Sequence, residues 1–388
     1  MNFDTIFSYH MPTKIVHGFG TTAETGKEAA SLKMKKVLLV TDKGIQGAGL
    51  TDKVSASLES AGIPVTIFGE VEEDPGTATV AKGLELLKTA GCDGVVIVGG
   101  GSPLCAGKGI ALLATNGGTL ADYEGSEKYK SLPLPVIGVP TTAGAGSEVS
   151  PVFIITDEKR NYKMAVMGKD IFPEVAILDP LLMANIPYWA GMNAGMDALS
   201  HAIGAFSTNL ANPITDALAI AAAATIVKYL APAILTNDLE AKNQQLLAST
   251  MANIACGNAK LDLTHALSHP LGSHHMSHGL ANGILIPYVM EFNLPVCADK
   301  FAQLAIAMNE AAPGMTTADL AVSAIEQVKE LFILTGYPTK IPAEFVTEKD
   351  IPDMVKQALT RLQIKFNKRR SSEKELANLY RLALAGWE

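Results

Sequence analysis

The chain has 388 residues, long enough for two domains, and 48% hydrophobic residues against 18% charged ones, enough for large buried cores. A formal net charge of −8 argues against nucleic acid or an anionic membrane surface as a partner. The four cysteines form no CxxC pair, and we find no signal-peptide pattern and no apolar run of membrane-spanning length. We therefore expect a cytoplasmic protein with no membrane partner.

The first half of the chain alternates strand-like and helix-like segments. Continuous apolar runs predict strands at residues 35–42, 63–71, 94–101, 134–142, 152–157 and 174–180. Helical periodicity lies between them, at residues 51–61, 77–90 and 106–114. This alternation predicts a mostly parallel sheet covered by helices on both faces.

The second half is rich in alanine and leucine with a helical period. Helices are predicted at residues 211–234, 241–256, 316–334 and 372–384. We place the boundary near residue 187. The predicted organisation is thus an α/β domain over residues 1–187 and an all-α domain over residues 188–388.

Two glycine-rich loops follow consecutive predicted strands. One is Gly99-Gly100-Gly101-Ser102, and the other runs from Pro140 through Thr141 and Thr142 to Glu148. Ligands of open parallel sheets bind beyond the carboxyl ends of strands, where loop amides and a helix N-terminus can hold a pyrophosphate. Tight turns use the same residues. The spacing around Lys108 does not fit a P-loop, and no GxGxxG follows a strand, so we predict a dinucleotide site of a less common kind.

Asp42 ends the first strong strand, in the sequence VTDKG. A carboxylate at this position typically accepts hydrogen bonds from an adenosine ribose and repels a 2′-phosphate, which would favour NAD over NADP. The alternative is a turn-forming aspartate beside Lys43 and Gly44.

Histidines concentrate in two short segments of the second half. Asp197 and His201 are four residues apart, as are His265 and His269, and His278 lies close behind. Residues at this spacing project from one helical face. One carboxylate with several imidazoles suits iron(II) or zinc, whereas isolated core histidines would only satisfy hydrogen bonds. The clustering favours a metal site.

These motifs together resemble the iron-containing (group III) alcohol dehydrogenases, a family that includes lactaldehyde reductase and 1,3-propanediol dehydrogenase. The resemblance covers nearly the whole chain, through VTDKG, GGGSPL, PTTAGAGSE, ILDP, GMDALSHAI, ANPITDALA and HALSHPLG…HGLANGILIPYVMEFN. It implies a dehydroquinate synthase-like fold, an active site in the cleft between the two domains, NAD as cofactor and a homodimer.

The resemblance also assigns residues. The implied metal ligands are Asp197, His201, His265 and His278, and the implied further active-site histidine is His269. The implied cofactor residues are Asp42, Asp74, Gly99, Gly100, Gly101, Ser102, Thr141, Thr142, Lys163 and Leu178.

The chain departs from the family pattern at two places. Cys105 stands where many members carry Asp, which we expect to leave a thiol packed under the loop. The His265–His278 segment is one residue shorter than usual, with Ser277 in place of a frequent Pro and two extra histidines, His274 and His275. Either extra histidine is an alternative fourth ligand.

The predicted function is a metal-dependent alcohol dehydrogenase or aldehyde reductase that transfers a hydride between NAD(H) and a small alcohol or aldehyde, with Fe(II) or alternatively Zn bound. His269 would relay the alcohol proton, or would only orient a hydrogen bond. The alternatives are a zinc-type glycerol dehydrogenase or dehydroquinate synthase, a maleylacetate reductase-like enzyme, and, from another class, a metal-dependent hydrolase without a redox cofactor.

Overall fold

The computed structural model describes residues 6–160 and 162–387. Contacts divide the chain into two units, here called the sheet unit (residues 10–185) and the helical unit (residues 6–9 and 186–387). The division falls between Asn185 and Ile186, close to the predicted boundary near residue 187, and it assigns the described N-terminal segment, residues 6–9, to the helical unit.

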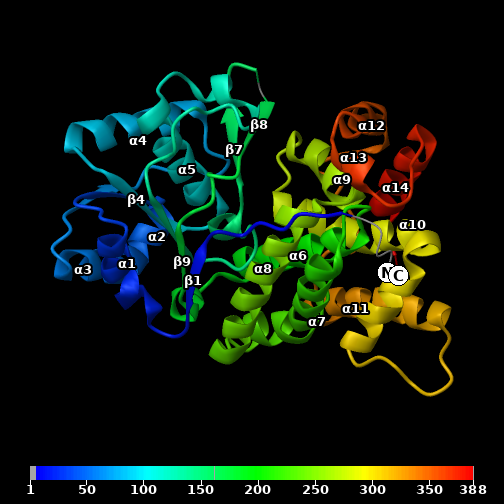
Figure 1. Cartoon of the computed structure of the whole chain (residues 1–388). Helices are drawn as coiled ribbons and strands as arrows, with labels where there is room; N and C mark the ends of the chain where they lie inside the picture. The colour runs from blue at the N-terminus through cyan, green and yellow to red at the C-terminus, as the bar shows by residue number, and fades with distance from the viewer. Residues whose placement is uncertain (1–5, 161, 388) are drawn as a thin grey trace. The chain divides into compact units, whose positions relative to one another are not determined.

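The sheet unit contains a parallel sheet of six strands in the order β1-β9-β6-β4-β2-β3. Its strands β1, β4 and β9 are labelled in Figure 1. The strands are β1 (Lys14–His17), β2 (Val37–Val40), β3 (Val65–Phe68), β4 (Gly94–Gly99), β6 (Val136–Pro140) and β9 (Val175–Leu178). Five of these were predicted from their apolar runs. The strand β1 was missed because it is four residues long, lies at the sheet edge and has no fully buried residue.

One predicted strand belongs elsewhere. β7 (Val152–Asp157) pairs antiparallel with β8 (Tyr162–Met167), which in turn pairs with β5 (Gly125–Ser126) in a separate three-stranded sheet. Residues of β7 alternate between half-buried and buried, the pattern of a strand with one covered face. The expectation that 152–157 joins the parallel sheet was therefore wrong.

Both faces of the six-stranded sheet are covered. Leu38 and Ile97 pack in one hydrophobic cluster with residues of α4 (Thr77–Ala90) and α5 (Gly101–Asn116). Leu39 and Val96 pack in another cluster with residues of α1 (Thr25–Ser31) and α3 (Leu50–Ser60). Neighbouring residues of a strand point to opposite faces, so helices on both sides require apolar residues at every position. A short helix, α2 (Lys43–Gly47), follows β2.

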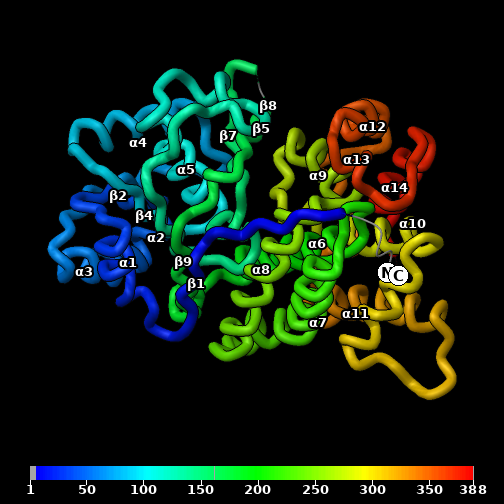
Figure 2. Tube along the Cα trace, in the orientation of Figure 1, coloured from blue at the N-terminus to red at the C-terminus, as the bar shows by residue number. Residues whose placement is uncertain are grey.

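The helical unit contains nine α-helices among the described residues, and the four predicted ones are confirmed. They are α6 (Tyr188–Ser207), α7 (Pro213–Leu235), α8 (Leu239–Ala259), α9 (Leu263–Gly272), α10 (His278–Ala307), α11 (Thr317–Thr335), α12 (Ile351–Leu359), α13 (Gln363–Phe366) and α14 (Glu373–Ala385). Consecutive helices α6, α7 and α8 lie side by side, as the backbone trace in Figure 2 shows. Side-chain oxygens of Asn212, Asp238, Asp262 and Ser372 cap their helices.

Two helices, α7 and α10, are long and apolar enough to cross a membrane by length and composition alone. The expectation that no segment reaches that length was wrong. In the most apolar window of α10, 72% of the residues are buried inside the structure, against 39% for α7. Burial of this kind is also found in core helices of globular proteins, so length alone assigns neither helix to a membrane.

Candidate active site

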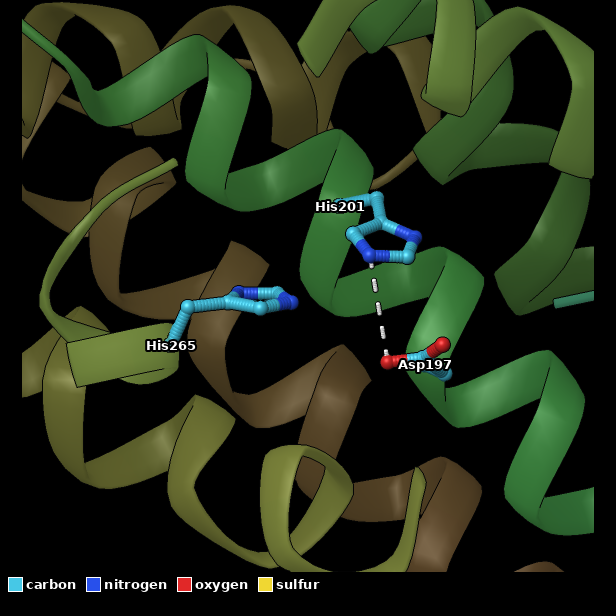
Figure 3. Close-up of side chains that lie close together, drawn as sticks. All are labelled: Asp197, His201 and His265. Carbon is cyan, nitrogen blue, oxygen red and sulfur yellow. Dashed lines mark ion pairs between the residues drawn. The ribbon is translucent and has the colours of Figure 1, made fainter. Parts of the chain in front are cut away.

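The helix α6 supplies two of the expected metal ligands. Asp197 and His201 are four residues apart, so both side chains project from the same face, as predicted. Both are buried, with 6% and 7% of their surface exposed. His201 Nε2 lies 3.9 Å from Asp197 Oδ1, the ion pair drawn in Figure 3.

His265, on α9, brings a third side chain to the same place (Figure 3). Its ring stacks on that of His201, with centroids 4.9 Å apart and an angle of 20° between the planes. Ligand atoms of Asp197, His201 and His265 all lie within 4.8 Å of one another. Asp262 fixes the start of α9, because its carboxylate accepts a hydrogen bond from the backbone of Thr264 at 3.0 Å.

The chemistry of these donors fits a divalent metal of borderline softness. Burial, and then the neighbouring His201, His278 and His269, lower the pKa of His265 well below its ordinary value, so its imidazole is neutral. A neutral imidazole keeps a nitrogen lone pair, which metal binding requires. One carboxylate oxygen with imidazole nitrogens is a donor set for Fe(II) or Zn(II).

His278 is the first residue of α10, next to this group. Its Nε2 lies 3.9 Å from Asp197 Oδ1, and its ring centroid is 5.4 Å from that of His265. Its side chain is 40% exposed, much more than the other three. The ring of His269 is 5.7 Å from that of His278, whereas His274 and His275 lie in the turn after α9.

Asn282 was not among the site residues expected from the sequence, and it is completely buried one helical turn after His278. Its amide nitrogen lies 2.8 Å from Asp197 Oδ1, 3.1 Å from His265 Nε2 and 3.0 Å from His278 Nε2. The same four-residue spacing that selected the histidines could have selected it, had amides been considered along with metal-ligating side chains.

Tyr337 was also missed, and only tertiary contacts reveal it. Its hydroxyl donates to Asn193 Oδ1 at 3.0 Å, and Asn193 Nδ2 donates to Ser277 Oγ at 3.4 Å. Burial raises the pKa of Tyr337 well above its ordinary value, so the hydroxyl keeps its proton. These two hydrogen bonds link Tyr337, through Asn193 of α6, to Ser277, the residue before His278.

The sheet unit has a cavity of about 530 Å³ beyond the carboxyl ends of β2, β3, β4 and β6. Six expected cofactor residues line it: Asp42, Gly100, Gly101, Ser102, Thr141 and Thr142. Lining residues that sequence analysis missed are Lys43, Gly44, Ile45, Glu70, Val71, Glu72, Glu73 and Pro103. The segment 70–73 could have been found, because it spans the carboxyl end of the strand predicted at residues 63–71 and follows β3 in the structure.

The loop at the cavity requires glycine and offers polar groups. Gly99 has φ +155°, and a Cβ there would lie 2.6 Å from Pro103 Cγ. The helix α5 begins at Gly101 without a side-chain cap among the described residues, which leaves its first amides for an anion. Thr141 Oγ1 is buried without a hydrogen-bond partner in the described part of the chain. These features fit a dinucleotide pyrophosphate.

Asp42 serves a structural purpose as well as lining the cavity. Its Oδ1 accepts a hydrogen bond from the Ile45 backbone at 2.9 Å and so caps α2. Asp42 therefore forms the turn, and its position at the cavity also allows it to contact a ribose.

Four expected cofactor residues, Asp74, Gly99, Lys163 and Leu178, are not among those that line this cavity. Asp74 and Lys163 form an ion pair, with Asp74 Oδ2 and Lys163 Nζ 2.7 Å apart. The backbone amide of Asp74 donates to Ser102 Oγ at 3.3 Å, so Asp74 contacts a residue of the glycine-rich loop. Leu178 is buried in β9. Gly99 does not line the cavity but allows the tight turn that leads into the loop.

Cys105, which stands where many family members carry Asp, has its thiol packed under the glycine-rich loop. Its Sγ accepts a hydrogen bond from the Ile154 backbone at 3.5 Å, within the hydrophobic packing under the loop. The nearby Lys108 donates to the backbone oxygens of Ser150 and Val152 at 2.8 and 3.1 Å. Lys108 is therefore directed to the start of β7, which agrees with the rejection of a P-loop.

The chain matches one protein family in sequence and in structure. The profile described as "Iron-containing alcohol dehydrogenase" matches residues 12–180, and the corresponding C-terminal profile matches residues 192–384. 1,3-Propanediol dehydrogenase of Citrobacter freundii is 38% identical over 97% of this chain and 99% of its own length. NAD-dependent methanol dehydrogenase of Bacillus methanolicus is 36% identical over 97% and 100%. The crystal structure of a 1,3-propanediol oxidoreductase superposes with a TM-score of 0.96, at 37% identity, covering 98% of this chain and all of the other.

The fold and these matches define an oxidoreductase. The chain belongs to the iron-containing alcohol dehydrogenase family. The predicted activity, interconversion of an alcohol and its aldehyde, is confirmed at this level, and the hydrolase alternative is not supported.

Proposed function

We propose that the protein is an NAD(H)-dependent dehydrogenase of small alcohols that binds one divalent metal, Fe(II) or Zn(II), through Asp197, His201, His265 and His278. The observation that carries the proposal is the convergence of three buried ligand atoms within 4.8 Å, from two helices separated by about sixty residues of sequence. A metal held by these residues would supply Lewis-acid polarisation of the alcohol or carbonyl oxygen, and a bound nicotinamide would supply the chemistry of hydride transfer.

Within this site each residue has a distinct role. Asp197 would supply the negative charge that offsets a dication. Buried His201 would supply a ring nitrogen, and His265, whose pKa is lowered by burial, would supply a neutral one. His278 is more exposed, and it adds a nitrogen from the side open to small molecules. His269 is half-buried beside His278, where it can hold the hydroxyl proton and pass it to solvent.

In the sheet unit, we propose that the cavity binds the dinucleotide. The first turn of α5 and the unpartnered Thr141 hydroxyl would bind the pyrophosphate. Asp42, together with Glu70 and Glu73 among the lining residues, would favour NAD over NADP, since carboxylates repel a 2′-phosphate. Support for the cofactor also comes from the NAD-dependent relative.

The substrate is a short alcohol or aldehyde, by analogy with relatives named for propanediol and methanol. Cytoplasmic location and a homodimer remain part of the proposal. The deciding experiment removes metal with a chelator, restores it with Fe(II) or Zn(II), and follows NADH absorbance with short alcohols, diols and aldehydes. Activity that requires the added metal is expected. Activity unaffected by chelation in protein shown to contain no metal would contradict the proposal.

A further inference from the structure

The side chain of Asn282 makes the densest set of contacts with the expected ligands. Its Nδ2 lies between 2.8 and 3.1 Å from Asp197 Oδ1, His265 Nε2 and His278 Nε2. These are three of the four proposed ligands, each contacted at an atom that could bind a metal.

The orientation of the amide follows from its chemistry. An amide nitrogen carries two hydrogens and only donates, while a carboxylate oxygen only accepts. Reversing the amide would place its oxygen 2.8 Å from the Asp197 oxygen, which would be repulsive. The two hydrogens of Asn282 are thus shared among three ligand atoms, and each imidazole accepts in the tautomer that leaves its Nε2 without a proton.

A metal ion requires the same lone pairs. A nitrogen lone pair that accepts a hydrogen bond cannot at the same time bind a cation, and Asp197 Oδ1 would have to divide its charge between the two. Asn282 Oδ1 is buried without a hydrogen-bond partner among the described residues. The amide nitrogen of Asn282 therefore provides hydrogen bonds to the ligand atoms, while its own amide oxygen receives none from the described residues.

We propose that Asn282 is a positioning residue that holds Asp197, His265 and His278 together before metal binds, and that its amide competes with the incoming metal for their lone pairs. This inference rests on the proposed metal site. It predicts that Asn282 stabilises the metal-free enzyme and weakens metal binding. A residue that only oriented the ligands, or that bound the metal through its own oxygen, would strengthen metal binding instead.

The test compares wild type with Asn282→Ala and Asn282→Val, the second of which fills space with no donor and limits replacement by water. Zn(II) affinity is measured by competition with a chelating dye, and melting temperature is measured with and without Zn(II). We expect the variants to bind Zn(II) about tenfold more tightly, the effect of removing a competing hydrogen bond to a charged group. The metal-free variants should melt at a lower temperature, with a larger rise when Zn(II) is added.

Asn293→Ala is the matched control. Asn293 is also a completely buried asparagine on α10, but it exchanges hydrogen bonds with Asn367 at 2.9 Å. Its loss should lower both melting temperatures equally and leave Zn(II) affinity unchanged.

The outcomes separate the two proposals. Wild type that binds no Zn(II) would overturn the proposed metal site. Wild type that binds Zn(II), with both Asn282 variants binding equally or more weakly, would overturn the role of Asn282 alone. If a variant does not fold without metal, refolding it in Zn(II) and measuring the rate of Zn(II) release to excess chelator decides: slower release than wild type is expected, and equal or faster release contradicts the inference.

Discussion

His201 and His265 stack face to face, with ring centroids 4.9 Å apart, although sixty-four residues separate them in sequence. Burial, and then the neighbouring ring of His201, disfavours the charged imidazolium form of His265, because charge is poorly stabilised in a medium of low dielectric constant. The lowered pKa of His265 agrees with this. The His265 imidazole is thus neutral and keeps the lone pair that metal binding requires.

Replacing either member of this pair should remove metal and activity together. We expect His201→Ala and His265→Ala each to lower metal affinity by at least about tenfold and to abolish turnover. NADH binding, followed by fluorescence, should persist because the lining residues of the cavity all belong to the sheet unit. Full activity in a variant shown to lack metal would contradict the assignment.

The segment from His265 to His278 is one residue shorter than in the family pattern, so the assignment of His278 as a ligand needs a direct test. His278→Ala should sharply reduce the metal content of the purified enzyme, since its Nε2 is 3.9 Å from Asp197 Oδ1. His274→Ala and His275→Ala should keep the metal and mainly change substrate preference. Elemental analysis of the three variants decides. If His274→Ala or His275→Ala loses the metal while His278→Ala keeps it, the fourth ligand is the histidine in the turn and not His278.

His269 should be needed for proton transfer but not for metal binding. We expect His269→Ala to retain metal and lower kcat by about a hundredfold, in the range typical of general acid–base groups. The acidic limb of the pH profile of kcat should shift or disappear, and added imidazole should restore part of the activity. Metal loss in this variant would make His269 a ligand, and an unaltered kcat would leave it without a catalytic role.

Cofactor preference can be separated from helix capping at Asp42. Asp42→Asn keeps an oxygen for the Ile45 amide and removes the charge, whereas Asp42→Gly removes both. Both variants should raise the ratio of NADP(H) to NAD(H) use, measured as kcat/KM. Only the glycine variant should also lose stability, by a few tenths of a kcal/mol for a cap replaced by glycine. A wild type that already prefers NADP(H) would show that the carboxylate does not face the ribose.

Glu148 should make stability depend on pH. Burial raises its pKa from 4.5 to about 7, so between these values the folded protein keeps a proton that the unfolded chain releases. The stabilising contribution is present in full below pH 4.5 and is lost as pH rises through 7. The loss amounts to up to about 3 kcal/mol for a shift of this size.

The glutamine variant tests this pH dependence. In Glu148→Gln the free energy of unfolding, from urea titrations at several pH values, should fall less over this range than in wild type. The same slope in both proteins would show that Glu148 does not cause it.

The sequence by itself determined the local features of this protein. Apolar runs located β2, β3, β4, β6 and β9, and helical spacing placed Asp197 and His201 on one face, because these patterns depend on residues close in sequence. The family motifs were specific enough to indicate the chemistry. Glycine-rich loops after two neighbouring strands indicated where a cavity lies.

Only the tertiary structure decided the features that depend on distant partners. It assigned β7 to a hairpin with β8, since the sheet that a strand joins is set by its pairing and not by its composition. It directed Lys163 to Asp74 and not into the cavity. It also placed Asn282 among three ligands, because an amide acquires such a role only from the groups that packing brings within hydrogen-bonding distance.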